Sequence, residues 1–198
     1  VLRWPPIHNQ YFLRFAVGPP KKCQIPNPQE TGKPNKNEKQ QSFARFAYLL
    51  QSIDTRQTID IDLLSSQANE NPVYYIQYAY ARIASVGREA DKRGVTRNPL
   101  SEIDPTLLTH ERELELLRAL STLPDTIEIA ARDRAPHKIS TWIRELAAVF
   151  HGFYHDCPVL RSDVESDLQQ ARLWLVESAR IGFSIGLDLL GLTAPEEM

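Results

Sequence analysis

Apolar residues recur at helical spacing from Ser42 onward, whereas the first 41 residues show no such period. Recurrence at positions i, i+3, i+4 and i+7 indicates an amphipathic helix, while strict alternation indicates a strand. No useful stretch after Ser42 alternates. We therefore expect helices over residues 42–53, 60–68, 72–92 and 111–123, and others beginning at Pro124, Pro136 and Ser162. The sequence predicts an all-α fold, a helical bundle.

Helix ends are marked by prolines, glycines and one capping pattern. Three prolines stand where a first helical turn tolerates them: Pro72, Pro124 and Pro136. Ser162 and Glu165 have the spacing of a capping box, and the helix they start should run to about Leu190, before Gly191. Small residues along one side of that helix predict close packing against a neighbour: Ala171, Ser178, Ala179, Gly182 and Gly186.

The first 41 residues have a different composition from the rest. Residues 1–18 carry aromatic side chains around Pro5 and Pro6, and their structure is left unassigned. Residues 19–41 hold five prolines, five lysines and hardly any apolar side chains. Such a segment buries too little surface to offset its ordering entropy, so we interpret it as a Pro/Lys-rich linker. A solvated tether is favoured over contact of its lysines with phosphate. The helical domain is expected over residues 42–198.

Charge is distributed unevenly between these parts. Residues 1–41 hold seven Lys/Arg and two Asp/Glu, a net +5, and residues 42–198 hold sixteen and twenty-three, a net −7. Non-specific nucleic-acid binding needs many cationic contacts that release counterions. An acidic body therefore argues against a general nucleic-acid binder and allows only recognition through a few bases.

Two further properties exclude other classes of protein. The longest apolar run falls short of the roughly 18 residues that a membrane span needs, so no membrane association is expected. Cys23 and Cys157 are too few for a disulfide framework or a zinc site, which favours a reducing compartment.

The stretch "NENPVYYIQYAYAR", residues 69–82, concentrates four tyrosines and an arginine in one helix. With about 100° per residue, the helix has an apolar face formed by Val73, Ile76, Tyr80 and Ile83. The opposite face carries Asn71, Tyr75, Tyr78 and Arg82. Flat rings and a guanidinium are what unpaired RNA bases stack upon. The alternative is that both faces are buried in the bundle, with the hydroxyls satisfied by neighbouring groups.

A second candidate segment is "HGFYHDCPVLRSD", residues 151–163, at a helix-to-loop junction. His151, Tyr154, His155 and Asp156 are expected to be exposed there. A histidine and an aspartate near Cys157 invite a nucleophile or metal interpretation, but no companion ligands and no oriented base accompany them. Because a Gly-rich phosphate loop is also absent, we predict no catalytic, cofactor or metal site.

Four stretches together resemble the C-terminal anticodon-binding (DALR) domain of arginyl-tRNA synthetase, a class I synthetase. They are "NPVYYIQYAYAR" (71–82), "FHGFYHDCPVL" (150–160), "ARLWLVESAR" (171–180) and "GLDLLGLTAPEEM" (186–198). Their order and spacing are similar over residues 42–198. The resemblance implies a helical bundle that receives the anticodon stem-loop of tRNA(Arg), in the cytoplasm or an organellar matrix.

Carried over residue by residue, the resemblance places Tyr78, Tyr154 and the terminal Met198 around the anticodon bases. Tyr75 and Arg82 are added from the helical wheel alone. These five residues are the predicted tRNA-binding site, with base stacking by Tyr78 and Tyr154 and a phosphate or base-edge contact by Arg82.

The chain also departs from the family. Tyr80 stands where histidine is usual, and residues 42–45 read Ser-Phe-Ala-Arg in place of an Asp-Ala-x-Arg stretch. The His-Ile-Gly-His and Lys-Met-Ser-Lys-Ser motifs that activate the amino acid are missing, so this chain alone is not expected to make arginyl-adenylate. ATP would be a cofactor of the full-length enzyme only, and a catalytic domain or protein partner would be reached through residues 1–41. Two alternatives stay open: a freestanding domain that acts as a tRNA adaptor, and a structural subunit of a larger assembly.

Overall fold

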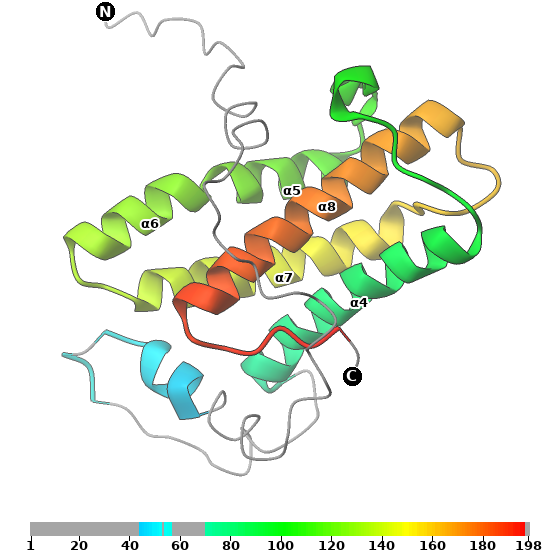
Figure 1. Cartoon of the computed structure of the whole chain (residues 1–198). Coiled ribbons are helices and arrows are strands. Elements are labelled where there is room, and N and C mark those ends of the chain that lie inside the picture. The colour runs from blue at the N-terminus through cyan, green and yellow to red at the C-terminus, as the bar shows by residue number, and fades with distance from the viewer. Residues whose placement is uncertain (1–43, 53, 57–69, 197–198) are drawn as a thin grey trace, which may run out of the picture. The chain divides into compact units, whose positions relative to one another are not determined.

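In the computed structural model, residues 44–52, 54–56 and 70–196 are the described part of the chain (Figure 1). Contacts divide the chain into Val1–Gly32 and Lys33–Met198, and every described residue belongs to the second unit. The predictions for residues 1–18, for the linker 19–41 and for a helix over 60–68 concern segments outside the described residues.

Helices account for the regular structure of the described residues, and no strand occurs among them, which confirms the all-α prediction. A short helix spans residues 44–49, which is less than the predicted 42–53. The others are α4 (Pro72–Lys92), η2 (Leu100–Glu102), η3 (Pro105–Leu107), α5 (Glu111–Ser121), α6 (Leu123–Arg132), α7 (His137–Asp156) and α8 (Ser166–Leu189). None of these described helices is sufficiently long and apolar to cross a bilayer.

Helix α4 begins at the predicted proline, and Asn71 before it is the N-cap. The Asn71 side-chain oxygen accepts from the backbone N–H groups of Val73, at 3.1 Å, and Tyr74. Since these amides would otherwise lack partners in the first turn, the cap stabilises the helix start by about 1 kcal/mol. Asn71 is fully buried in this role. The assignment of Asn71 to the polar face of the helix is therefore wrong.

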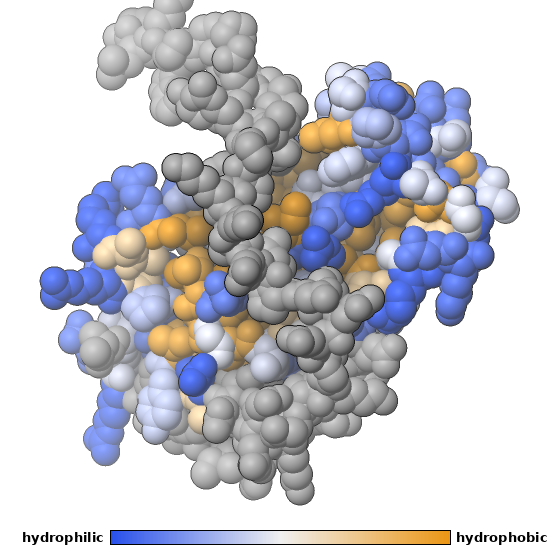
Figure 2. Space-filling view, in the orientation of Figure 1, coloured by the Kyte–Doolittle hydropathy of each residue, from blue (hydrophilic) through white to orange (hydrophobic). Residues whose placement is uncertain are grey.

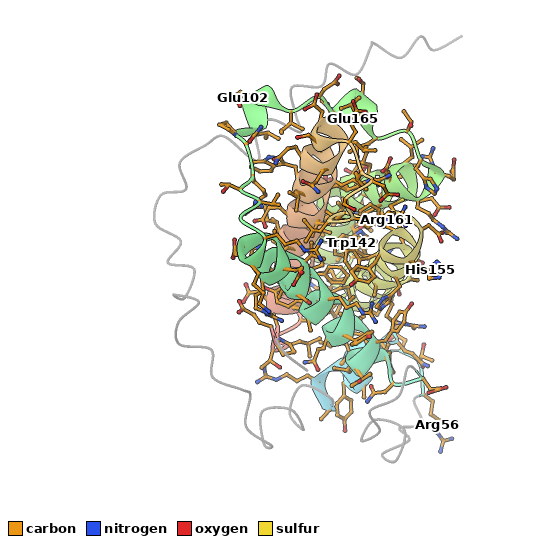
Figure 3. All side chains as sticks on the ribbon, turned by 90° about the vertical axis from the view of Figure 1, so that its right-hand side faces the viewer. Arg56, Glu102, Trp142, His155, Arg161 and Glu165 are labelled. Carbon is orange, nitrogen blue, oxygen red and sulfur yellow. The ribbon has the colours of Figure 1, made fainter. Side chains whose placement is uncertain are left out.

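Helix α7 lies at the centre of the bundle and contacts α4, α5, α6 and α8 (Figure 1). An apolar stripe is buried along the helix: Ile139, Ile143, Leu146 and Phe150. Trp142 is buried with them between the helices (Figure 3). Its ring N–H donates to the Ala119 carbonyl at 2.9 Å, so a buried polar atom has a partner and α7 is tied to α5.

Helix α8 packs closely on α5 and α7 through its glycines, as its small-residue side predicts. A Cβ on Gly182 would lie 2.8 Å from Leu120, and one on Gly186 would lie 2.9 Å from Ile143. The predicted capping box before this helix is wrong. Helix α8 begins at Ser166 after Glu165, which makes no side-chain cap hydrogen bond.

A capping box does occur, at the start of α5. His110 accepts from the N–H of Arg112, and Glu113 accepts from the backbone N–H of His110 at 2.9 Å. His110 therefore has a structural role. Glu113 is almost fully buried and also binds Arg172 of α8, with 2.6 Å between Oε1 and Nε. This ion pair joins two helices in the interior.

Candidate nucleic-acid interface

The two faces of α4 separate as the helical wheel predicts. The apolar face is buried in the core: Val73, Ile76, Tyr80 and Ile83, at most 7% exposed. Three side chains of the other face, Tyr75, Tyr78 and Arg82, are half-buried and lie against the C-terminal half of α7. Tyrosines on this face therefore contact a neighbouring helix and solvent at once.

A histidine of α7 lies between two of these tyrosines. The ring centroid of His151 is 4.6 Å from that of Tyr75 and 5.7 Å from that of Tyr78. The Tyr78 ring is also parallel to that of Tyr74, one helical turn earlier, with 6.1 Å between centroids. Such spacings are typical of attractive aromatic pairs. The rings form a continuous layer between the two helices.

Arg82 extends this layer by bridging α4 and α7. Its guanidinium carbon lies 4.8 Å from the ring centroid of Tyr78 and 4.7 Å from that of Tyr154, and its N–H donates to the Tyr78 hydroxyl. That hydrogen bond raises the pKa of Arg82, whose charge is therefore permanent. Cation–π contacts at half-exposed sites contribute about 0.5–2 kcal/mol each.

Tyr154 connects the layer to the core. Its ring lies 6.2 Å from that of Phe150, which is fully buried and packs edge-on against Phe183 of α8. The Tyr154 ring thus packs against a fully buried neighbour, while Tyr154 itself is only partly buried. The next residue, His155, points outward from the end of α7 (Figure 3), with 88% of its side chain exposed.

Burial changes the protonation chemistry of the layer. It raises the pKa of the Tyr75 hydroxyl. For His151, burial lowers the pKa, a backbone contact with Tyr75 opposes this, and the Arg82 charge adds to the lowering. The Nε2 atom of His151 is buried without a hydrogen-bond partner among the described residues. A neutral imidazole is therefore the form that this environment favours.

The neighbouring cysteine and acidic residues do not form a reactive site. Cys157 is fully buried, and burial together with the Glu113 charge raises the pKa of its thiol to about 11. A thiol of this kind is a poor nucleophile at neutral pH. The part of the chain that the structure describes contains no cluster of three metal-binding side chains.

Four of the five predicted site residues are thus brought together: Tyr75, Tyr78, Arg82 and Tyr154. Met198 lies outside the described residues. Sequence reasoning missed Tyr74 and underrated His151, although their spacing gives a signal. Tyr74 is four residues before Tyr78, and His151 is three before Tyr154, so each shares a helical face with a predicted residue. We call the six side chains Tyr74, Tyr75, Tyr78, Arg82, His151 and Tyr154 the tyrosine layer.

Longer proteins contain regions similar to this chain. It is 46% identical over 155 residues to the arginine–tRNA ligase of Carboxydothermus hydrogenoformans, which covers 78% of this chain and 28% of that protein. The arginine–tRNA ligase of Desulforamulus reducens is 44% identical over the same length, 27% of that protein. The chain therefore spans between a quarter and a third of these relatives.

A solved structure shows the same arrangement of helices. The arginyl-tRNA synthetase of Thermus thermophilus has a TM-score of 0.68 with this structure and 27% sequence identity. The similar region covers 86% of this chain and 29% of the Thermus chain. The helices that carry the tyrosine layer thus belong to a fold already seen within a tRNA synthetase.

A family match covers the same part of the chain. The DALR anticodon binding domain family matches residues 76–198, more than half of the sequence and most of the described helices. The match includes α5 to α8 and all of the tyrosine layer except Tyr74 and Tyr75. With an all-α bundle, a synthetase as structural neighbour and this match, the chain belongs to the DALR anticodon binding domain family.

Proposed function

We propose that this chain is the anticodon-binding part of an arginine–tRNA ligase and that it recognises tRNA(Arg) through the tyrosine layer. The observation that carries the proposal is the position of Arg82 between the rings of Tyr78 and Tyr154. A permanent cation and two flat rings, all half-exposed, offer an unpaired RNA loop both stacking surfaces and a contact for phosphate or a base edge.

Electrostatics favour selective over general binding. The described surface is rich in carboxylates, and the body carries a net −7, so it repels a phosphate backbone over most of its area. Among the described arginines, Arg82 is engaged by phenols and not by a carboxylate. An RNA that reaches the tyrosine layer meets one positively charged side chain there, Arg82. Binding then depends on the few bases that fit, which is what anticodon recognition requires.

The rest of the ligase activity would come from residues outside this chain. The aligned region is 28% of the relative, so ATP binding and aminoacylation are proposed for a catalytic domain in the part of the ligase that this sequence does not cover. Met198 is proposed as a further base contact from the C-terminal end. The cytoplasm or an organellar matrix is the proposed location. The freestanding adaptor and the structural subunit gain no support from the relatives named above.

Binding of the chain to a tRNA(Arg) transcript, compared at matched salt with the same transcript carrying a replaced anticodon, tests the proposal. We expect tighter binding of the arginine anticodon, and loss of that preference in Tyr154→Ala. A matched control is Trp174→Ala on α8, because this aromatic side chain contacts Arg97 away from the tyrosine layer. Equal affinity for the two transcripts would refute the proposal.

A further inference from the structure

After α8 the chain continues without regular secondary structure through residues 191–196, which we call the tail. The tail lies beside α4 (Figure 1). It starts at Gly191, whose φ of +64° is in the left-handed region that favours glycine. Two residues of the tail are buried, Leu192 and Pro195. The tail therefore leaves α8 in a defined direction and packs against the bundle.

Three side chains bind the tail through its main chain. They donate to backbone carbonyls: Arg45 to Gly191 at 2.9 Å, Gln77 to Thr193 at 3.0 Å, and Arg88 to Glu196 at 3.1 Å. Gln77 also donates to the Thr193 hydroxyl oxygen at 3.1 Å. Because the acceptors are carbonyls spread along the tail, these bonds fix its position along α4 whatever side chains it carries.

The tail lies on the part of the α4 surface next to the tyrosine layer. Gln77 and Arg88 are eleven residues apart, which is about 20° around a helix and about 16 Å along it, so both lie on one side. Around the same helix, Tyr74 is about 60° from Gln77 and Tyr78 about 100°. Tyr78 in turn contacts His151 of α7. The layer thus lies between the tail on one side and α7 on the other.

We propose that Arg45, Gln77 and Arg88 are positioning residues that hold the tail as a fixed border of the tyrosine layer. They thereby set where Met198, two residues after Glu196, meets the bound RNA. The proposal rests on the function proposed above. A tail that is already held in place loses little conformational freedom when RNA binds, so its contact with RNA adds to affinity.

Gln77 is the residue that tests this role most directly. Its side chain is only 3% exposed, so it acts on RNA through the tail and not by contact. Gln77→Met removes the donor with a side chain of similar size and no change of charge. The matched control is Gln170→Met, because Gln170 of α8 is also buried and donates to the backbone carbonyl of Thr96, at 3.0 Å, in the loop after α4.

Hydrogen exchange, measured without RNA on the peptide that contains the tail, reports whether the tail is held. Exchange should be faster in Gln77→Met than in the parent and unchanged in Gln170→Met. Binding to a tRNA(Arg) transcript should be about tenfold weaker in Gln77→Met and equal to the parent in Gln170→Met.

A chain that lacks residues 193–198 shows whether the effect on RNA passes through the tail. In this shortened chain, Gln77→Met should cause no further loss of affinity, because there is no tail left to hold. The inference is refuted if Gln77→Met weakens the shortened chain by the same factor as the full chain. It is also refuted if Gln77→Met speeds exchange in the tail and leaves the affinity of the full chain unchanged. The proposed function stands in both cases.

Arg45 gives a second test that does not depend on a buried side chain. Arg45 is exposed, so Arg45→Met removes a tie to the tail without disturbing the core. Its affinity for the transcript should fall, and Arg45→Lys, which keeps the charge and a donor, should recover part of the loss. An Arg45→Met chain with the affinity of the parent would refute the inference. If the parent itself does not distinguish the arginine anticodon from a replaced one, the proposed function fails, and this inference fails with it.

Discussion

Helix α7 has two sides that contrast in packing. On the side toward α8, Phe150 meets the buried Phe183 edge-on, and Gly186 allows Ile143 to approach closely. Toward α4, the C-terminal half of α7 meets half-exposed rings and Arg82, beside a hollow that no side chain fills. The first side has the density of a protein interior, and the second has the aromatic and polar groups of a binding surface.

The arginines of the two sides show the same contrast. Arg172 is buried in an ion pair with Glu113 and also donates to the Pro158 carbonyl at 2.7 Å. Arg82 lies between phenol rings and has no carboxylate partner among the described residues. A guanidinium neutralised by a buried acid stabilises one conformation of the chain. A guanidinium held only by rings keeps its charge for an incoming anion.

Apolar side chains exposed on α8 do not alter this comparison. Ile181 and Leu189 are about half exposed, and Figure 2 shows apolar side chains over the C-terminal half of this helix. None of the cation–ring contacts among the described residues involves this surface. The recognition chemistry lies between α4 and α7.

The largest expected effect is on the buried ion pair. Arg172→Met leaves the Glu113 carboxylate almost fully buried without its cation, which should lower the free energy of unfolding by about 3–5 kcal/mol. Urea unfolding measures it. Arg118→Met is the matched control, since it breaks an exposed pair with Glu111 and should cost about 1 kcal/mol or less. Equal losses in the two variants would remove the distinction between the structural and the binding arginines.

The second effect is on RNA affinity. Tyr154→Ala should weaken binding to tRNA(Arg) by about 1–3 kcal/mol, because a base loses its stacking partner and Arg82 loses one of its two rings. Helical circular dichroism should not change, since α7 is held by its other contacts. Filter binding at fixed salt measures the affinity. An affinity equal to that of the parent would show that Tyr154 is only a packing residue.

The helical wheel was sufficient to predict which face of α4 is buried. Val73, Ile76 and Ile83 lie within one arc, and burial follows from the apolar period alone. The same reasoning could not assign Asn71, because a cap is defined by backbone geometry at the first turn and not by position on the wheel. Local pattern therefore predicted the helices and their faces better than their ends.

Contacts distant in sequence could not be predicted from the chain alone. Glu113 and Arg172 are 59 residues apart, and nothing in either segment signals that they pair. The hollow beside Tyr75 likewise depends on how α4 lies against α7. The resemblance to a family supplied Tyr154, which no wheel connects to Tyr78. The arrangement of helices, more than any single segment, creates the candidate site.

The third prediction separates the charge of Arg82 from its shape. Arg82→Lys keeps the charge but loses the planar group between the two rings, so affinity should fall by about 0.5–1 kcal/mol with the same salt dependence. Arg82→Met should weaken binding further and reduce the salt slope by about one counterion. A salt slope that is equal in Arg82→Met and the parent would show that Arg82 makes no phosphate contact.

The smallest expected effect is on stability at acidic pH, and it involves His151. Burial and the Arg82 charge lower the pKa of this imidazole in the folded chain, so the unfolded chain takes up the proton first as pH falls. The free energy of unfolding should therefore decrease from about pH 6.5, the ordinary value for histidine, down to the lowered pKa of the folded state. Above that range His151 is neutral in both states and contributes no pH dependence.

His151→Gln removes this titration while keeping a polar side chain between Tyr75 and Tyr78. Urea unfolding measures the free energy of unfolding of the parent and of this variant at pH 7.5 and pH 5.5. All other titrating groups are the same in both proteins, so a difference in their pH dependence comes from His151. The parent should lose more stability than the variant on acidification, because only the parent has the His151 imidazole. In the folded parent, this imidazole must either carry a second positive charge beside Arg82 or stay neutral while the unfolded chain binds a proton. Equal losses of stability in the two proteins would mean that a protonated His151 is as stable in the tyrosine layer as it is in water. The α4 side of α7 would then be less enclosed than its ring contacts indicate, and its contrast with the α8 side would be greater.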